Sequence, residues 1–353
     1  MSSASPMWPG VPLALTSAAL FGMSTPLAKL LLGTVDPWLL AGLLYLGAGL
    51  GLGGLQLIRA IGKKRNDEAP LRRSDFPWLV AVVISGGVAG PLMLMLGLTN
   101  TSAASASLLL NLEGLATMAI AWLVFRENVD RRLLLGAFAI LIGAVVLSWK
   151  GDARLDTGGL LIAGACLAWG IDNNLTRKLS SADPVKLAII KGLAAGSVNL
   201  VLALAMGAKL PGAVVLLGAG IVGFLGYGVS LVLFVLGLRH LGTARTGAYF
   251  SLAPFVGAIL AVVVLKDHVS LQLITAGAFM AIGLWLHLTE RHEHLHAHEP
   301  VEHEHRHLHD EHHQHAHGPG DPEGEPHTHR HHHLPLTHKH PHFPDLHHRH
   351  RHE

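Results

Sequence analysis

Long runs of apolar residues, separated by short polar segments, follow one another along most of this sequence. They cover residues 11–32, 38–58, 77–98, 103–125, 133–149, 158–176, 187–206, 213–238, 246–265 and 271–289. A helix needs about 20 mostly apolar residues to cross the hydrocarbon core of a membrane. The pattern therefore predicts an all-α membrane protein with ten transmembrane helices.

Lysine and arginine are unevenly divided among the segments between these runs. If the N-terminus is cytoplasmic, the inner loops hold fourteen of them and the outer loops hold four: Lys150, Arg154, Lys209 and Lys266. Positive charge concentrates on the cytoplasmic side of membrane proteins. We therefore expect a multi-pass protein of the inner (plasma) membrane with both termini in the cytoplasm. Residues 1–10 lack the basic residues that begin a signal peptide, so the first run is expected to be a retained helix.

Two stretches of the chain resemble each other at a fixed offset. Residues 96–100 match 236–240, and the charged pair Arg126–Glu127 matches Lys266–Asp267, both 140 positions apart. Residues 20–29 likewise resemble 168–177. Each half, 11–149 and 158–289, holds five apolar runs, so a repeat would be inverted in the membrane, as in many transporters. Chance similarity between apolar segments is the alternative.

The segments LEGLATMAIAWLVFREN (112–128) and LAPFVGAILAVVVLKDH (252–268) resemble the EamA branch of the drug/metabolite transporter superfamily. The resemblance covers residues 11–289, with Gly114 where the first repeat of the family often has proline and Pro254 in the second. It implies a secondary carrier, often an exporter of amino acids or other small metabolites. No phosphate-binding loop, HExxH or CxxC motif is present, and neither an enzyme activity nor a nucleic-acid partner is expected.

Several polar side chains fall inside apolar runs, where they cost free energy unless they face a cavity or a partner. Glu113 lies in the fourth run beside Asn111, and it either binds a substrate amine or a proton, or serves packing. A second group in the sixth run either binds a zwitterion or marks an early end of the helix at the headgroups. The predicted substrate-binding residues are Glu113, Asn111, Trp169, Asp172, Asn173, Arg177 and Tyr249.

Two lysines in the apolar runs have a simpler interpretation. Lys29 and Lys191 are expected to extend their charged ends to the membrane surface. The glycine pairs Gly47/Gly51 and Gly49/Gly53 indicate either a close helix crossing or general small-residue packing.

Residues 291–353 differ from the rest, because 24 of the 27 histidines lie between His292 and His352. Few apolar residues accompany them, so we expect a disordered cytoplasmic tail without stable strands. Histidine alternates with other residues, and imidazole binds Zn, Cu and Ni. The predicted metal ligands are His292, His294, His296, His298, His303, His305, His307, His309, His312, His313, His315 and His317. A solvated linker and a pH-responsive segment are the alternatives.

These observations favour a carrier for a small organic metabolite, amino-acid-like or drug-like, with a tail that binds Ni, Co, Zn or Cu. The alternatives are a divalent-metal transporter and a membrane-anchored metal buffer or sensor. No cofactor is expected to be required. The expected partners are a small-molecule substrate, the lipid bilayer and divalent metal ions, and a homodimer is left open.

Overall fold

The computed structural model describes residues 10–61, 71–125, 131–149, 156–176, 179, 183–289, 293–298, 302–307, 327–332 and 336–341. Every described element between residues 10 and 289 is helical. The first half of this region contains α1 (Gly10–Leu32), α2 (Pro37–Ile61), η1 (Arg73–Asp75), α3 (Phe76–Val82), the π-helix η2 (Val83–Ala89), α4 (Gly90–Asn100), α5 (Ala103–Leu109), α6 (Leu112–Phe125) and α7 (Arg131–Ser148). The third and fourth apolar runs are thus each built from several consecutive helical pieces.

The second half begins after the described residue Asp156. It contains α8 (Thr157–Thr176), α9 (Pro184–Ala205), α10 (Ala213–Gly223), the π-helix η4 (Phe224–Val229), α11 (Ser230–Phe250), α12 (Ala253–Leu265) and α13 (Leu271–Leu288). A π-helical segment therefore occurs in the third membrane-crossing stretch of both halves.

The predicted loop between the apolar runs 213–238 and 246–265 is wrong. The backbone of residues 239–245 continues α11 as a helix, and the chain turns only at Ser251 and Leu252. Pro254 occupies the first turn of α12. Proline disfavours helix in the residue before it and suits the start of a new helix. The break between α11 and α12 therefore lies just before Pro254 and not at residues 239–245.

Eight described helical stretches are long and apolar enough to cross a membrane. The sixth and ninth predicted spans form helices too, but α8 and α12 are not among the eight. α12 has 13 residues. α8 carries Asp172, Asn173 and Asn174 near its end, so it depends on its neighbours to shield polar groups from lipid.

The second helix of each half begins in the same way. Asp36 precedes Pro37, and its Oδ1 accepts hydrogen bonds from the backbone amides of Trp38 and Leu39 at 2.9 and 3.2 Å. Asp183 precedes Pro184, and its Oδ1 accepts from the two corresponding amides at 2.9 and 3.3 Å. An aspartate N-cap followed by proline satisfies free amides at a helix start. Local sequence thus fixes where α2 and α9 begin.

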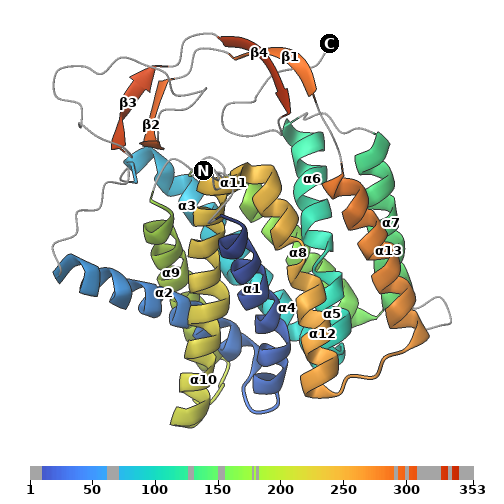
Figure 1. Cartoon of the computed structure of the whole chain (residues 1–353). Helices are drawn as coiled ribbons and strands as arrows, with labels where there is room; N and C mark the ends of the chain where they lie inside the picture. The colour runs from blue at the N-terminus through green and yellow to red at the C-terminus, as the bar shows by residue number, and fades with distance from the viewer. Residues whose placement is uncertain are drawn as a thin grey trace, which may run out of the picture.

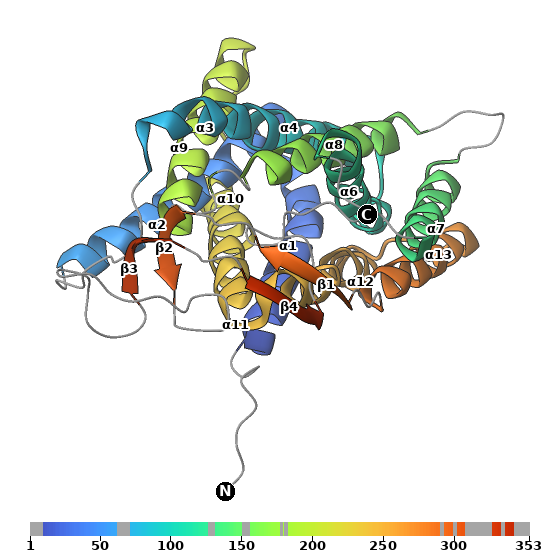
Figure 2. The same cartoon turned by 90° about the horizontal axis from the view of Figure 1, so that it is seen from above.

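The helices pair in a reciprocal way, as the view from above shows (Figure 2). α2 packs against α9, the second helix of each half, and α7 packs against α13, the fifth of each half (Figure 1). α1 contacts α11 and α12, while α8 contacts α4 and α6. Each first helix therefore packs on the third and fourth stretches of the other half.

Glycines allow the closest of these crossings. A Cβ on Gly192 of α9 would lie 2.7 Å from the amide nitrogen of Gly49 on α2. A Cβ on Gly47 would overlap the backbone of Gly220 on α10. Both glycines of α2 thus serve close helix crossings, whereas the nearest atom to a Cβ on Gly53 is 4.0 Å away.

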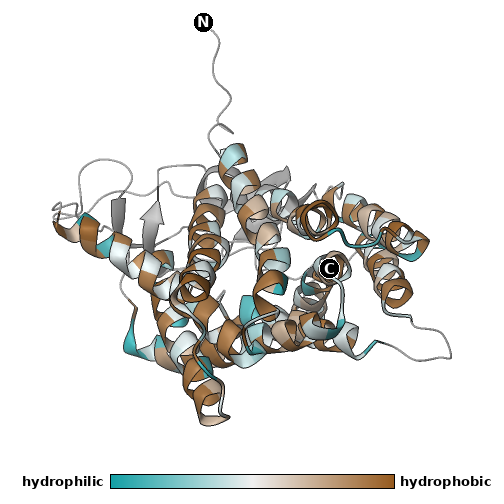
Figure 3. Ribbon diagram, turned by 90° about the horizontal axis from the view of Figure 1, so that it is seen from below, coloured by the Kyte–Doolittle hydropathy of each residue, from teal (hydrophilic) through white to brown (hydrophobic). Residues whose placement is uncertain are grey.

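Large apolar side chains cover the outside of the bundle, and brown hydrophobic ribbon dominates the helices (Figure 3). Leu57, Ile58, Val214 and Leu271 are each more than 60% exposed. Many of the fully buried residues are instead alanines and glycines. Large apolar residues outside and small residues between helices suit a protein surrounded by lipid.

The described part of the tail differs from our expectation. β1 (Glu293–His298) pairs antiparallel with β4 (Leu336–Pro341), and β2 (Glu302–His307) pairs antiparallel with β3 (His327–His332). The prediction of a tail without strands is therefore wrong for these 24 residues, four strands of six each. The alternation of histidine with other residues has the period of a β-strand.

Candidate solute-binding site

The π-helix η2 presents backbone carbonyls to side chains of other helices. The carbonyl of Gly86 accepts hydrogen bonds from the Tyr45 hydroxyl of α2 at 2.7 Å and from the Trp169 indole of α8 at 2.9 Å. The carbonyl of Gly87 accepts from the amide of Asn199 on α9 at 3.2 Å. π-Helical turns commonly mark functional positions. Here three helices bind the same irregular turn.

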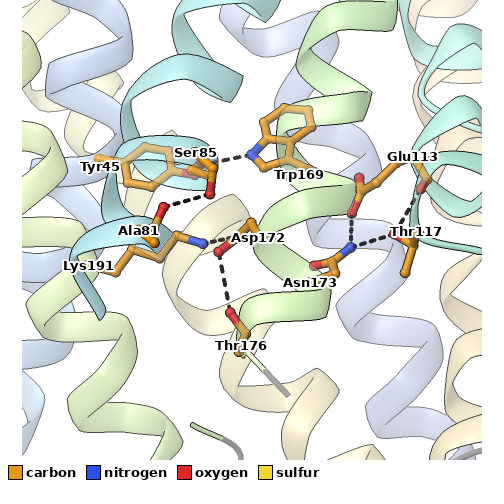
Figure 4. Close-up of polar contacts among 11 residues, drawn as sticks. Tyr45, Ala81, Ser85, Glu113, Thr117, Trp169, Asp172, Asn173, Thr176 and Lys191 are labelled. Carbon is orange, nitrogen blue, oxygen red and sulfur yellow. Dashed lines mark hydrogen bonds and ion pairs between the residues drawn. The ribbon is translucent and has the colours of Figure 1, made fainter. Parts of the chain in front are cut away.

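Beside this turn lies an ion pair between Asp172 of α8 and Lys191 of α9 (Figure 4). The Asp172 and Lys191 side chains are 6% and 17% exposed, so the pair is largely buried. The Thr176 hydroxyl donates to the other oxygen of Asp172 at 3.3 Å. A Cβ on Gly86 would overlap the Asp172 carboxyl group, so only glycine leaves room for the carboxylate here.

A second polar group surrounds Glu113 at the start of α6. The amide of Asn173 donates to Glu113 Oε1 at 3.0 Å and to the Thr117 hydroxyl oxygen at 3.2 Å, and that hydroxyl donates to the Glu113 carbonyl at 2.9 Å (Figure 4). Glu113 is half-buried, and Asn173 is exposed. Among the described residues, Glu113 has no ion-pair partner.

α8 joins the two groups, because Asp172 and Asn173 are consecutive and face different neighbours (Figure 4). Asn174, the next residue, is 3% exposed and donates to the carbonyls of Thr117 and Gly170 at 3.0 and 2.8 Å. Asn174 thus fastens α8 to α6. The arrangement holds two carboxylates and one ammonium group inside a mostly apolar bundle.

The structure brings four predicted residues together: Glu113, Trp169, Asp172 and Asn173. Asn111 lies elsewhere, in the turn between α5 and α6, where it donates to the Leu108 carbonyl at 2.8 Å and contacts the Met280 sulfur at 3.8 Å. Tyr249 lies at the end of α11 and is not part of the group in Figure 4. Arg177 lies outside the described residues.

The predicted metal ligands also divide into residues that the structure describes and residues that lie outside the described ranges. Six are placed on strands β1 and β2: His294, His296, His298, His303, His305 and His307. The other six, His292, His309, His312, His313, His315 and His317, lie outside the described residues.

Sequence reasoning missed the part played by Lys191. We expected it to reach the membrane surface, whereas it pairs with Asp172. It lies seven residues after Pro184, which places it about 10 Å along the helix at 1.5 Å per residue. That depth in the helix is a sequence signal against the lysine reaching the membrane surface. Tyr45, Thr117 and Gly86 gave no such signal, because their roles depend on contacts between distant helices.

A bundle of long apolar helices with buried charges of both signs is typical of a polytopic membrane protein. A model of the EamA-like transporter family matches residues 8–149 and 156–289. The chain belongs to this family, whose members are transporters.

The proteins that this chain is similar to include two relatives and a solved structure. An uncharacterized transporter of Methanothermobacter thermautotrophicus is 30% identical over 77% of this chain and 84% of its own length. The uncharacterized transporter YyaM of Bacillus subtilis is 23% identical over 55% of this chain and 67% of its own. A crystal structure of a protein shares the fold with a TM-score of 0.60, at 20% identity, over 79% of this chain and 98% of that chain.

The two donors to the Gly86 carbonyl should not act independently. We expect Tyr45→Phe alone to lower the free energy of unfolding by about 0.5–1.5 kcal/mol, because Trp169 still donates to the carbonyl. Tyr45→Phe with Trp169→Phe leaves a buried carbonyl without a donor, so the double variant should lose about 1 kcal/mol more than the sum. Chemical unfolding of the purified protein in detergent measures all three variants.

The matched control combines Tyr45→Phe with Trp285→Phe. Trp285 lies on α13, next to Arg132, and is 58% exposed. The effects of this control pair should add. If the first pair also adds, the Gly86 carbonyl does not depend on these two donors.

Proposed function

We propose that the protein is a secondary transporter of the inner membrane that moves a small organic solute with an ammonium group, such as an amino-acid-like metabolite. The observation that carries this proposal is Glu113, a carboxylate within the bundle that Asn173 orients and that no described cation neutralises. An ionisable residue inside a membrane is a functional candidate by default. The likeness to two relatives described as transporters supports the class.

The charge count around α8 favours a cationic group on the solute. Lys191 neutralises Asp172, and the charge on Glu113 is left over. A charge in a low-dielectric region is costly without a partner of opposite sign. A solute ammonium group would supply that partner. The Glu113 carboxylate, which Asn173 orients, would in turn fix the position of the ammonium group.

We further propose that the two halves, 11–149 and 158–289, are inverted repeats that rock about the site between them. The reciprocal helix pairing supports this, since α2 meets α9 and α7 meets α13. The shared Asp–Pro helix starts and the π-helix in each half support it as well. Alternating access in such carriers moves one repeat against the other around a fixed site.

The tail supports a second candidate function, binding of divalent metal ions such as Ni, Co, Zn or Cu. In the β2–β3 register His303 lies opposite His331, His305 opposite His329, and His307 opposite His327. Alternate residues of a strand share a face, and directly opposite Cβ atoms lie about 5 Å apart. Six histidines therefore occupy alternating and mutually opposite positions of β2 and β3, a pattern that supports metal binding. Of the forms that metal binding by the tail could take, a metal buffer or sensor attached to the carrier is therefore favoured.

Inversion predicts that positions 65 and 209, which follow the second span of each half, lie on opposite sides of the membrane. Arg65→Cys should be labelled by an impermeant thiol reagent only after the cells are opened, whereas Lys209→Cys should be labelled in intact cells. Both are made in a Cys166→Ala background, because Cys166 is the only native cysteine. Labelling of both positions from the same side would contradict the inverted repeat.

Counterflow into proteoliposomes tests the solute class. We use labelled glycine, L-leucine, L-lysine, ethylamine and propionate. Ammonium-bearing probes should exchange, and Glu113→Gln should lower their exchange about tenfold or more, since a hydrogen bond to a charged group is worth roughly 1.5–3 kcal/mol. Asp75→Asn, at the exposed turn η1, is the matched carboxyl-to-amide control and should exchange normally. Equal uptake by empty and loaded vesicles for every probe would remove the carrier proposal.

Calorimetric titration of the full-length protein with Ni²⁺ and Zn²⁺ tests the tail. Replacing His303, His305 and His307 with alanine should remove a larger share of the bound metal than replacing His347, His348 and His350, which lie outside the described strands. Equal losses would mean that histidine number matters and the strand register does not. Removing residues 291–353 should leave solute counterflow intact; loss of counterflow would mean that the tail is part of the transport function.

A further inference from the structure

The Asp172–Lys191 pair is not needed to explain binding of a solute ammonium group, yet it occupies the middle of the polar cluster. Asp172 is 5% exposed, and its carboxylate packs directly on the backbone of Gly86. Buried ion pairs contribute little to stability compared with apolar side chains of similar size. Its position next to Glu113, the proposed ammonium-binding group, therefore indicates a chemical role.

The groups around Asp172 are donors. Lys191 and Thr176 donate to its carboxylate oxygens, while Tyr45 and Trp169 donate to the adjacent Gly86 carbonyl. A metal cation needs several oxygen ligands in place of its water shell. The nearby Gly86 oxygen already accepts two hydrogen bonds, so the surroundings suit a proton, which needs one carboxylate oxygen.

We propose that Asp172 is the proton-binding site that couples transport to a proton gradient, and that its protonation frees Lys191 to bind the anionic group of the solute. The proposal rests on the proposed carrier function and adds the coupling ion and the second half of the solute site. The proton binds the Asp172 oxygen that held the Lys191 ammonium group. Asp172 becomes neutral, Lys191 keeps its charge, and no other bond is made or broken.

Charge balance links the two events. With a zwitterion bound, the solute ammonium group pairs with Glu113 and the solute carboxylate pairs with Lys191. Asp172 must then be neutral, because its former partner is occupied. Among the described residues at this level of the bundle, every charge is paired when one proton accompanies one zwitterion. Proton and solute therefore bind together, each strengthening the binding of the other.

The titratable groups that face Asp172 are Lys191 of α9, Tyr45 of α2 and Glu113 of α6. The Tyr45 hydroxyl donates to Gly86 and so is engaged. Glu113 accepts a hydrogen bond from Asn173, the residue after Asp172, so it lies about 100° around α8 from the Asp172–Lys191 pair (Figure 4). Lys191 is therefore the cation whose release accompanies protonation of Asp172.

The transport test uses proteoliposomes with a pH-sensitive dye inside, L-leucine as the zwitterion and ethylamine as the amine without a carboxylate. L-Leucine should carry protons with it in the native protein. Asp172→Asn should abolish this proton movement and make L-leucine counterflow independent of pH, because asparagine resembles the protonated acid. Lys191→Met should lower L-leucine counterflow about tenfold or more and ethylamine counterflow by much less, since only L-leucine loses a charge-assisted hydrogen bond.

Two results would overturn the proposal. One is unchanged proton movement with Asp172→Asn. The other is an equal loss of both probes with Lys191→Met, which indicates that the pair only holds α8 against α9. Asp75→Asn serves again as the control for handling and reconstitution.

A measurement without solute separates this proposal from the carrier proposal. Infrared spectra of the purified full-length protein, recorded as the pH is lowered, should show a carboxyl absorption that appears on protonation. It should be missing in Asp172→Asn and remain in Glu113→Gln. If no probe shows counterflow but this signal is present, the solute class is wrong and the proton site stands. If no Asp172-dependent absorption appears at any pH, the proton site is wrong.

Discussion

The rule that a charge in a low-dielectric interior needs a partner constrains this molecule more than any other interaction. Asp172 meets it through Lys191, and the surrounding backbone is shaped to allow that contact, because Gly86 has no side chain where the carboxylate lies. The same turn binds Tyr45 and Trp169. α2, α8 and α9 are therefore held at one level by a few polar contacts, while packing of small residues holds the rest.

α8 shows how a helix that is poorly suited to lipid becomes stable in a membrane. Asp172, Asn173 and Asn174 would be costly in hydrocarbon, yet each finds a partner on α9 or α6. A helix that carries such polar groups needs neighbouring helices on its polar side. This requirement accounts for its contacts with α4, α6, η2 and α3, while the apolar side chains of Leu160 and Leu167 remain exposed.

Much of the fold could be predicted from the sequence, because apolar runs of membrane length and the Asp–Pro helix starts are local signals. The internal boundaries could not. The break at residues 110–111 and the π-helices depend on contacts between helices, and Pro254 outweighed the basic residues at 239–245. In the site, Glu113, Trp169, Asp172 and Asn173 were identifiable as polar or aromatic residues inside apolar runs. Lys191 was wrongly expected to reach the membrane surface, because that expectation considered its own helix alone. Its partner, Asp172, lies on another helix.

The π-helices have a mechanical consequence. A π turn contains one residue more than the α turn it replaces, so its hydrogen bonds can pass from one register to the next without breaking the helix. Each residue of an α-helix advances about 100° around the axis. A one-residue migration of the η2 bulge would therefore swing Gly86 away from Asp172 and turn the neighbouring part of the span, with η4 placed to do the same in the other half. A change as small as a single peptide unit would be enough to reset the environment of the buried carboxylate.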